Sequence, residues 1–177
     1  MVKPIVIAVA AIPAIMASLI AIPLLTQPEI PFSAANPNDQ IEIEYTKHQL
    51  KKVSFGVTER VGAQKTEILL IKYNGDLRYT LTEDGVPSPD VRNQLDEDKF
   101  KKLAAMIKET GFIAIPSESF PIKDDVDEYQ KSTVKITLNG VVNQIHWPEQ
   151  NATEKFVPPI ITMVELELNQ IIDDISE

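Results

Sequence analysis

The chain has 177 residues, which is enough for one ordinary domain with additional segments but not for two full-sized domains. Its 26 acidic residues outnumber its 17 Lys and Arg, and the net charge of −9 has the wrong sign for binding nucleic-acid phosphates or anionic lipid headgroups. The absence of Cys excludes disulfides, thiolate catalysis, iron–sulfur clusters and cysteine-based zinc sites. The chain also has only two His, so we expect no metal and no cofactor. From the net charge we expect no nucleic-acid partner.

The segment Ile5–Leu25 contains no charged residue. As a helix it would be about 31 Å long, close to the roughly 30 Å thickness of a hydrocarbon core. The alternative is a cleaved signal peptide, whose apolar region normally covers only about 7–15 residues. We therefore predict that residues 1–25 form a single-pass transmembrane anchor.

Charge predicts the orientation of this anchor. Lys3 lies on one side of the apolar segment, whereas residues 41–177 on the other side carry 16 basic and 24 acidic residues. Because positive residues favour the cytoplasmic side, we expect a cytoplasmic N-terminus and an extracytoplasmic C-terminal domain in the cell membrane. The single N-x-S/T triplet begins at Asn151, which agrees with an external domain and makes Asn151 a candidate glycosylation site.

Small residues follow one side of the predicted anchor. Ala10, Ala14 and Ser18 recur every four residues, a spacing that lets a second helix approach closely. Alanine is also common in anchors that pack against nothing. We expect this side to pack against integral membrane subunits of a larger assembly.

Three prolines interrupt residues 26–40, at Pro28, Pro31 and Pro37. They favour extended backbone and predict a tether between the anchor and the domain. Two arrangements fit this composition. The tether either lifts the domain off the bilayer or lies along a partner.

The domain is expected to begin with three antiparallel strands. Val53, Phe55 and Val57 alternate with small or polar residues, as in a half-buried strand. The rest of this predicted meander consists of a strand at residues 65–73, a two-residue turn at Asn74–Gly75 and a strand at residues 77–81 that ends at Asp84–Gly85.

A helix with clear ends follows. Asp96 is a good N-cap, Leu95 and Phe100 occupy the positions of a hydrophobic staple, and Gly111 suits the left-handed position after the last turn. Phe112 can then fold back on the helix. We predict a helix that begins after Asp96 and ends before Gly111.

A second hairpin and a second helix complete the domain. The hairpin turns at Asn139–Gly140 between strands at residues 134–138 and 141–147, and the apolar spacing after Pro158 indicates an amphipathic helix. The predicted order is β-β-β-α-β-β-α. Residues 41–177 are thus expected to form an α+β domain with an antiparallel sheet of about five strands and both helices on one face.

Residues 95–116 (LDEDKFKKLAAMIKETGFIAIP), 124–140 (DDVDEYQKSTVKITLNG) and 145–149 (IHWPE) resemble the emfourin family of proteinaceous inhibitors of thermolysin-like metalloproteases. The resemblance implies a non-catalytic domain whose exposed loops, at residues 83–93 or 117–128, enter a protease cleft. The whole chain also resembles membrane-anchored proteins of ammonia-oxidising archaea. That resemblance implies an accessory subunit of the ammonia monooxygenase.

No catalytic group of residues is recognisable. Asp124, Asp125, Asp127 and Glu128 offer oxygen ligands for Ca²⁺, but their spacing lacks the Gly and the terminal Glu of a calcium loop, which favours a solvated loop. His146 has no second His nearby in the sequence and is expected to be structural or on the surface. Neither G-x-S-x-G nor H-E-x-x-H occurs. We predict a non-enzymatic accessory or stabilising subunit of a membrane protein complex, with a membrane-tethered protease inhibitor as the alternative.

Overall fold

The computed structural model describes residues 39–116 and 120–176 of the chain. The predicted anchor, its small residues Ala10, Ala14 and Ser18, and nearly all of the predicted tether lie outside the described residues. Within the described ranges, none of the helices has both the length and the apolar composition that crossing a membrane requires.

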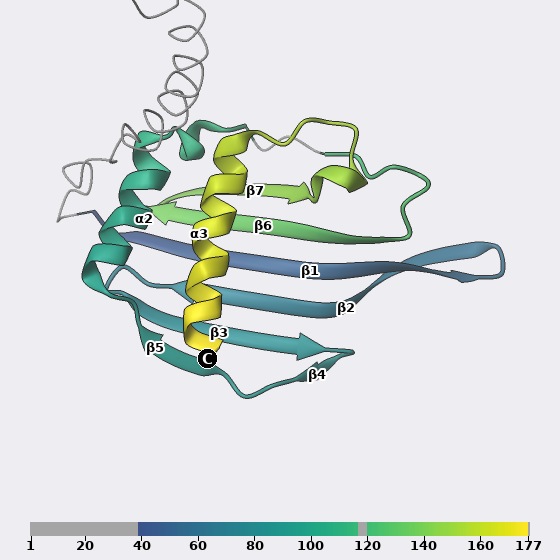
Figure 1. The fold of residues 1–177 in the computed structure, drawn as a ribbon, viewed down its shortest axis with the longest axis horizontal. Helices are drawn as coiled ribbons and strands as arrows, with labels where there is room; N and C mark the ends of the chain where they lie inside the picture. The colour runs from purple at the N-terminus through teal and green to yellow at the C-terminus, as the bar shows by residue number, and fades with distance from the viewer. Residues whose placement is uncertain (1–38, 117–119, 177) are drawn as a thin grey trace, which may run out of the picture. The chain divides into compact units, whose positions relative to one another are not determined.

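The described residues form one antiparallel sheet with two α-helices and two short 3₁₀ helices (Figure 1). In chain order the elements are β1 (Ile41–Phe55), β2 (Thr58–Ile71), β3 (Asp76–Glu83), β4 (Val86–Pro87), β5 (Val91–Gln94), α2 (Glu97–Glu109), η2 (Phe112–Ala114), β6 (Glu128–Leu138), β7 (Val141–Pro148), η3 (Gln150–Ala152) and α3 (Pro159–Ser176). The strand order is β4-β3-β2-β1-β6-β7, and β5 also pairs with β3. The predicted α+β class is confirmed.

The prediction of about five strands was too low, because β4 and β5 were not expected. Asp84 and Gly85 do not simply end β3. Both have positive φ angles, 48° and 80°, and they form a tight turn that pairs Glu83 with Val86. All residues of β4 and β5 are exposed, so neither strand has the apolar alternation that marks a strand in a sequence.

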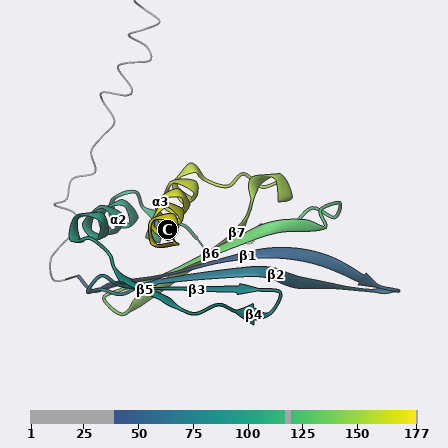
Figure 2. The ribbon, with the colours of Figure 1, turned by 60° about the horizontal axis from the view of Figure 1, so that its bottom comes forward.

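Both helices cover one face of the sheet, as predicted, and no described element covers the other face (Figure 2). The helices pack through fully buried side chains, among them Leu103, Ile107, Val164 and Leu168. The buried side chains of the sheet that form the core with them include Ile43, Tyr45, Leu69, Ile71, Val134, Ile136, Ile145 and Trp147.

Helix α2 has the ends that were predicted from the sequence. The Asp96 carboxylate accepts hydrogen bonds from the backbone amides of Asp98 and Lys99, at 3.0 and 3.2 Å. Gly111 has a φ of 73°, in the left-handed region that favours glycine, and Phe112 is buried. The predicted cap residues are confirmed at both ends.

The structure confirms one of the two predicted two-residue hairpin turns, and the other turn is longer than predicted. Asn139 and Gly140 both have positive φ, 51° and 82°, which confirms a two-residue turn. The turn after β2 has three residues instead, because the Lys72 amide donates a hydrogen bond to the Asp76 carbonyl at 2.9 Å. Gly75 is the third residue of this loop and has a φ of 81°. The loop is therefore one residue longer than predicted.

The largest difference between the predicted and the observed strands concerns β1. This strand begins at Ile41, and Ile41, Ile43 and Tyr45 are at most 2% exposed. Its end lies beyond the helices, and the chain turns at Gly56, which has a φ of 66°. The predicted strand is confirmed for residues 53–55, which belong to β1, but its expected half burial was wrong, because no described element packs over this part of the ribbon. Val57 lies in the turn and is fully exposed.

Candidate interaction site

Strands β1 and β2 continue beyond the rest of the sheet as a two-stranded ribbon (Figure 1). The pairing of β1 with β6 ends at Lys51, opposite Glu128, and the pairing of β2 with β3 begins at Lys65, opposite Glu83. Between these rungs the two strands pair with each other, out to the turn between Phe55 and Thr58. We call the ribbon from Lys51 to Lys65 the arm.

The arm exposes three valines. Val57 is fully exposed at the turn, Val61 is 51% exposed, and Val53 is 39% exposed. Burying such a side chain fully contributes about 1.5–3 kcal/mol relative to leaving it in water. A group of exposed apolar side chains on one projection is typical of an interaction surface.

Both faces of the arm carry a valine beside a cation. Val53 lies opposite Arg60, and the adjacent rung places Val61 opposite Lys52. Neighbouring rungs point to opposite sides of a ribbon, so Lys51 adds a second cation to the face of Val53, whereas Glu59 adds an acid to the face of Val61. This arrangement suits insertion into a groove better than packing against one flat surface.

The arm is also locally basic. It carries Lys51, Lys52, Arg60 and Lys65 against the single acid Glu59, a formal net charge of +3 within a chain of net charge −9. Two of these cations, Lys51 and Lys65, form ion pairs with Glu128 and Glu67 outside the arm. The overall charge therefore does not describe this projection. A basic surface with apolar side chains is complementary to an acidic partner surface with an apolar centre.

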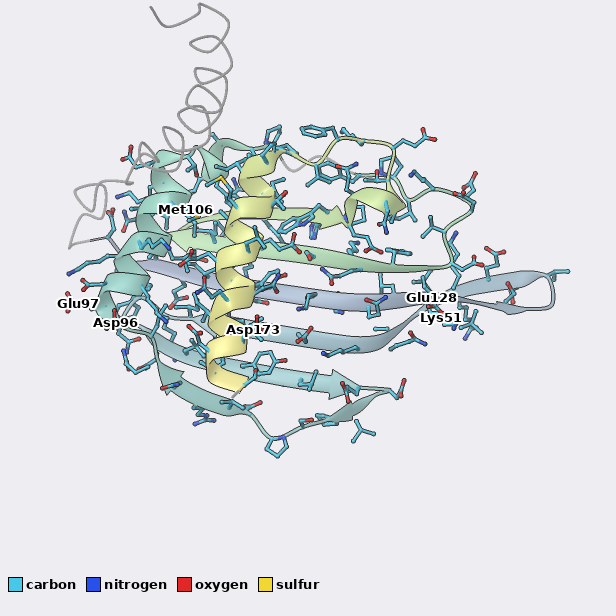
Figure 3. The ribbon with its side chains drawn as sticks, viewed as in Figure 1. Lys51, Asp96, Glu97, Met106, Glu128 and Asp173 are labelled. Atoms are coloured by element: carbon cyan, nitrogen blue, oxygen red, sulfur yellow. The ribbon has the colours of Figure 1, made fainter. Side chains whose placement is uncertain are left out.

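The predicted acidic loop holds the root of the arm. Lys51 forms an ion pair with Glu128, and the Lys52 amide donates a hydrogen bond to the Asp127 carbonyl at 2.7 Å (Figure 3). The Lys52 ammonium donates to the Asp124 carbonyl at 3.1 Å. Asp124, Asp125, Asp127 and Glu128 are all exposed. In the described part of the chain, neither these acids nor any His, Asp and Glu elsewhere gather as a metal-binding group.

His48 and His146 lie on the sheet face opposite the helices. The Nδ1 atom of His48 is 2.9 Å from Thr66 Oγ1, and that of His146 is 3.0 Å from Thr133 Oγ1. Burial lowers the pKa of both imidazoles, and the Lys131 charge lowers it further. Each imidazole thus bonds to a threonine on the adjacent strand, an arrangement that suits a structural role.

A polar network connects the sheet to α3. The Glu165 carboxylate accepts hydrogen bonds from Ser132 Oγ at 2.7 Å, Trp147 Nε1 at 3.0 Å and the Tyr45 hydroxyl at 3.3 Å. Burial, with the nearby Glu165 charge, raises the pKa of the Tyr45 hydroxyl, which therefore stays protonated and able to donate. The network fixes the position of α3 over the sheet.

A second network lies beside it. Glu67 is 7% exposed, accepts a hydrogen bond from the Tyr79 hydroxyl at 2.8 Å, and forms an ion pair with Lys47 at 2.9 Å. Burial acts to raise the pKa of Glu67, but the bonds from Lys47 and Tyr79 and the charges of Lys47 and Lys65 outweigh it and lower the pKa. Both networks are fully engaged in holding the fold.

A cavity of about 730 Å³ opens beside the start of β1. Asp39 and Lys108 form an ion pair at its edge, and hydrogen bonds from Asn139 and Lys108 lower the pKa of Asp39. Its described lining contains no His, Ser or Thr. A Ser–His or Thr–His pair is therefore not formed among these lining residues.

The remaining sequence-predicted site residue, Asn151, is exposed and lies in η3. Its backbone carbonyl accepts a hydrogen bond from the Lys123 ammonium at 2.8 Å.

Comparison with known proteins gives no relative from which a role could be transferred. Neither the protein-family models nor the curated proteins contain a match to this chain.

Proposed function

We propose that this chain is a non-catalytic, single-pass membrane protein whose external domain is an accessory or stabilising subunit of a membrane protein complex. The observation that supports this proposal is the arm, which extends apolar and basic side chains away from the core. An isolated monomer gains nothing from the exposure of Val53, Val57 and Val61. Burial of these valines against a neighbouring subunit would contribute about 1.5–3 kcal/mol for each fully buried side chain.

The proposal includes the predicted membrane topology. An anchor at residues 5–25 would hold the domain beside integral membrane subunits, with Ala10, Ala14 and Ser18 on the packing side. The N-terminus would lie in the cytoplasm and the domain outside it. The ammonia monooxygenase, implied by the whole-chain resemblance, is the first assembly to examine.

Purification of the full chain in mild detergent tests the proposal. We expect wild type to elute as a complex with a membrane protein, measured by size-exclusion chromatography with light scattering. Val57→Asp should release most of that protein, because a charge replaces the apolar tip of the arm. Val86→Asp is the matched control, since Val86 is 69% exposed and lies on β4 outside the arm.

Two results would contradict the proposal. The wild-type chain could elute alone under every mild detergent condition, in which case it is no subunit of a stable complex. Alternatively, Val57→Asp and Val86→Asp could retain the membrane protein equally, in which case the arm is not the contact.

A protease inhibitor is the second candidate, and one observation favours it. Every residue from Glu83 to Gln94 is exposed, so this edge of the sheet offers an extended segment of the kind that enters a protease cleft. Full chain at micromolar concentration should then inhibit a thermolysin-like protease. If cleavage of a reporter peptide is unchanged, the resemblance to emfourins concerns the fold alone.

A further inference from the structure

A second exposed apolar surface lies between the two α-helices. A groove of about 450 Å³ is lined by Met106 of α2 and by Met163 and Leu166 of α3, among other residues. Met163 is 47% exposed and Leu166 is 64% exposed, whereas Met106 is nearly buried. Methionine side chains are flexible and adapt to the shape of an inserted group. We call this surface the helix groove.

The charge of the helix groove is opposite to that of the arm. Glu167 and Asp173 line it, and Figure 3 shows Asp173 on α3 and Met106 on the neighbouring helix. The other two acids of α3 do not line the groove, since Glu165 binds side chains of the sheet and Asp174 forms an ion pair with Lys99 of α2 at 2.7 Å. Lys102 of α2 offsets part of this charge through an ion pair with Glu167 at 3.0 Å. Asp173 remains as an exposed acid on the groove.

We propose that the arm of one copy of this chain inserts into the helix groove of a second copy. The inference rests on the proposed function, in which the domain acts by protein contact, and it identifies the membrane protein that the arm contacts as a second copy of this chain. Val57 supplies the apolar tip, and Met163 and Leu166 supply the receiving side chains. Lys52 and Arg60 lie on opposite faces of the arm, so either face offers a cation to the acidic edge of the groove.

The contact has to form between copies. The arm projects beyond the sheet and away from both helices, so it does not reach the groove of its own chain (Figures 1 and 2). Each copy therefore presents one arm and one helix groove. If two copies exchange arms reciprocally, a closed dimer results, whereas a head-to-tail arrangement gives a ring or a longer chain of subunits.

Cysteine cross-linking tests this contact directly, because the chain has no Cys of its own. Full-length Val57→Cys and full-length Met163→Cys are mixed in detergent under mild oxidation. We expect a disulfide-linked pair of unlike copies, identified on non-reducing gels and by mass spectrometry. In the control, Val57→Cys is mixed with Phe156→Cys, since Phe156 is 69% exposed and does not line the groove. The control should cross-link at least about tenfold more slowly.

A charge exchange tests the electrostatic part of the contact. Adding Arg60→Glu to the Val57→Cys chain should slow the cross-link with Met163→Cys by about three- to tenfold. Adding Asp173→Lys to the Met163→Cys chain should restore most of the rate, because the opposite charges then meet again in reversed order. Far-ultraviolet circular dichroism of each variant checks that the fold is retained.

The outcomes separate this inference from the proposed function. If Val57→Cys reacts with Met163→Cys no faster than with Phe156→Cys, a second copy is not the occupant of the groove. If Val57→Asp nevertheless releases the membrane protein, the arm binds a different subunit and the proposed function stands. If Val57→Asp has no effect on the complex either, both the inference and the proposed function are wrong.

Discussion

The two halves of the β1–β2 ribbon differ in what covers them. In the first half, Ile43, Tyr45, Leu69 and Ile71 lie beneath the helices and are at most 1% exposed. In the arm, the valines of the same two strands are 39% exposed or more. Backbone pairing runs through both halves, with one irregularity at Gln49. The strands thus differ in the layer above them, and we conclude that the covered half stabilises the domain while the arm is available for contact.

The largest expected difference in unfolding free energy is between two truncations, one in each half of β2. Leu69→Ala should lower the free energy of unfolding by about 2–5 kcal/mol, because it leaves a cavity under the helices. Val61→Ala should change it by less than about 0.5 kcal/mol, because Val61 is 51% exposed and no described helix covers it. Urea unfolding of both full-length variants in the same detergent measures the difference. Equal losses would show that the arm contributes to the stability of the domain.

A smaller loss of unfolding free energy is expected when the Glu165 network, which joins the covered half to α3, is disrupted. Glu165→Ala leaves the donors on Ser132 and Trp147 without their acceptor, whereas the Tyr45 hydroxyl keeps Asn169 Oδ1 at 3.3 Å, and the substitution should cost about 2–3 kcal/mol of unfolding free energy. Glu154→Ala removes an exposed carboxylate by the same substitution and should be nearly neutral. Urea unfolding again compares the two. Similar midpoints would show that the network adds little to stability.

The helix-free face should make stability depend on pH. Since the pKa of His48 and of His146 lies below the ordinary value of 6.5 in the folded protein, the unfolded chain binds protons more readily there. The stabilisation is therefore complete above about pH 6.5 and is lost as the pH falls from 6.5 through the folded pKa values. Thermal unfolding between pH 5 and 8 should show this decrease, and a His48→Gln, His146→Gln double variant should flatten it.

Glu67 should make the stability of the fold depend on pH in a lower range than the two histidines do. Its folded pKa lies below the ordinary value of 4.5, so its contribution is present above pH 4.5 and is lost as the pH falls through the folded pKa. Glu67→Gln should remove this second decrease in stability.

A double histidine variant that keeps the full decrease in stability above pH 5 would assign that decrease to groups other than His48 and His146.

Local signals account for what the sequence could predict. The caps of α2, the Asn139–Gly140 turn and the apolar spacing of α3 depend on neighbours in the chain, and the structure confirms all three. The network around Glu165 could not be predicted, because Tyr45 is 120 positions away from it in the sequence. No local pattern indicates which strand positions will face a distant helix.

The arm was missed for a different reason. Val53, Phe55 and Val57 alternate as they would in a covered strand, and the alternation carries no information about whether a helix lies above it. Gly56 between two apolar residues was a turn signal, and its φ of 66° shows its role. The net charge of −9 likewise concealed a projection of charge +3. Charge counted over each predicted hairpin would have revealed it.

Accessibility of the arm tip in native membranes tests the central claim most directly. Full-length Val57→Cys and the control Val86→Cys are each labelled with a bulky maleimide, first in intact membranes and then after detergent has dissociated the complex. We predict that Cys at position 57 is protected in membranes by at least about tenfold and becomes reactive after dissociation, whereas Cys at position 86 reacts equally in both. Equal labelling of position 57 in both states would show that nothing binds the arm, and would contradict the account.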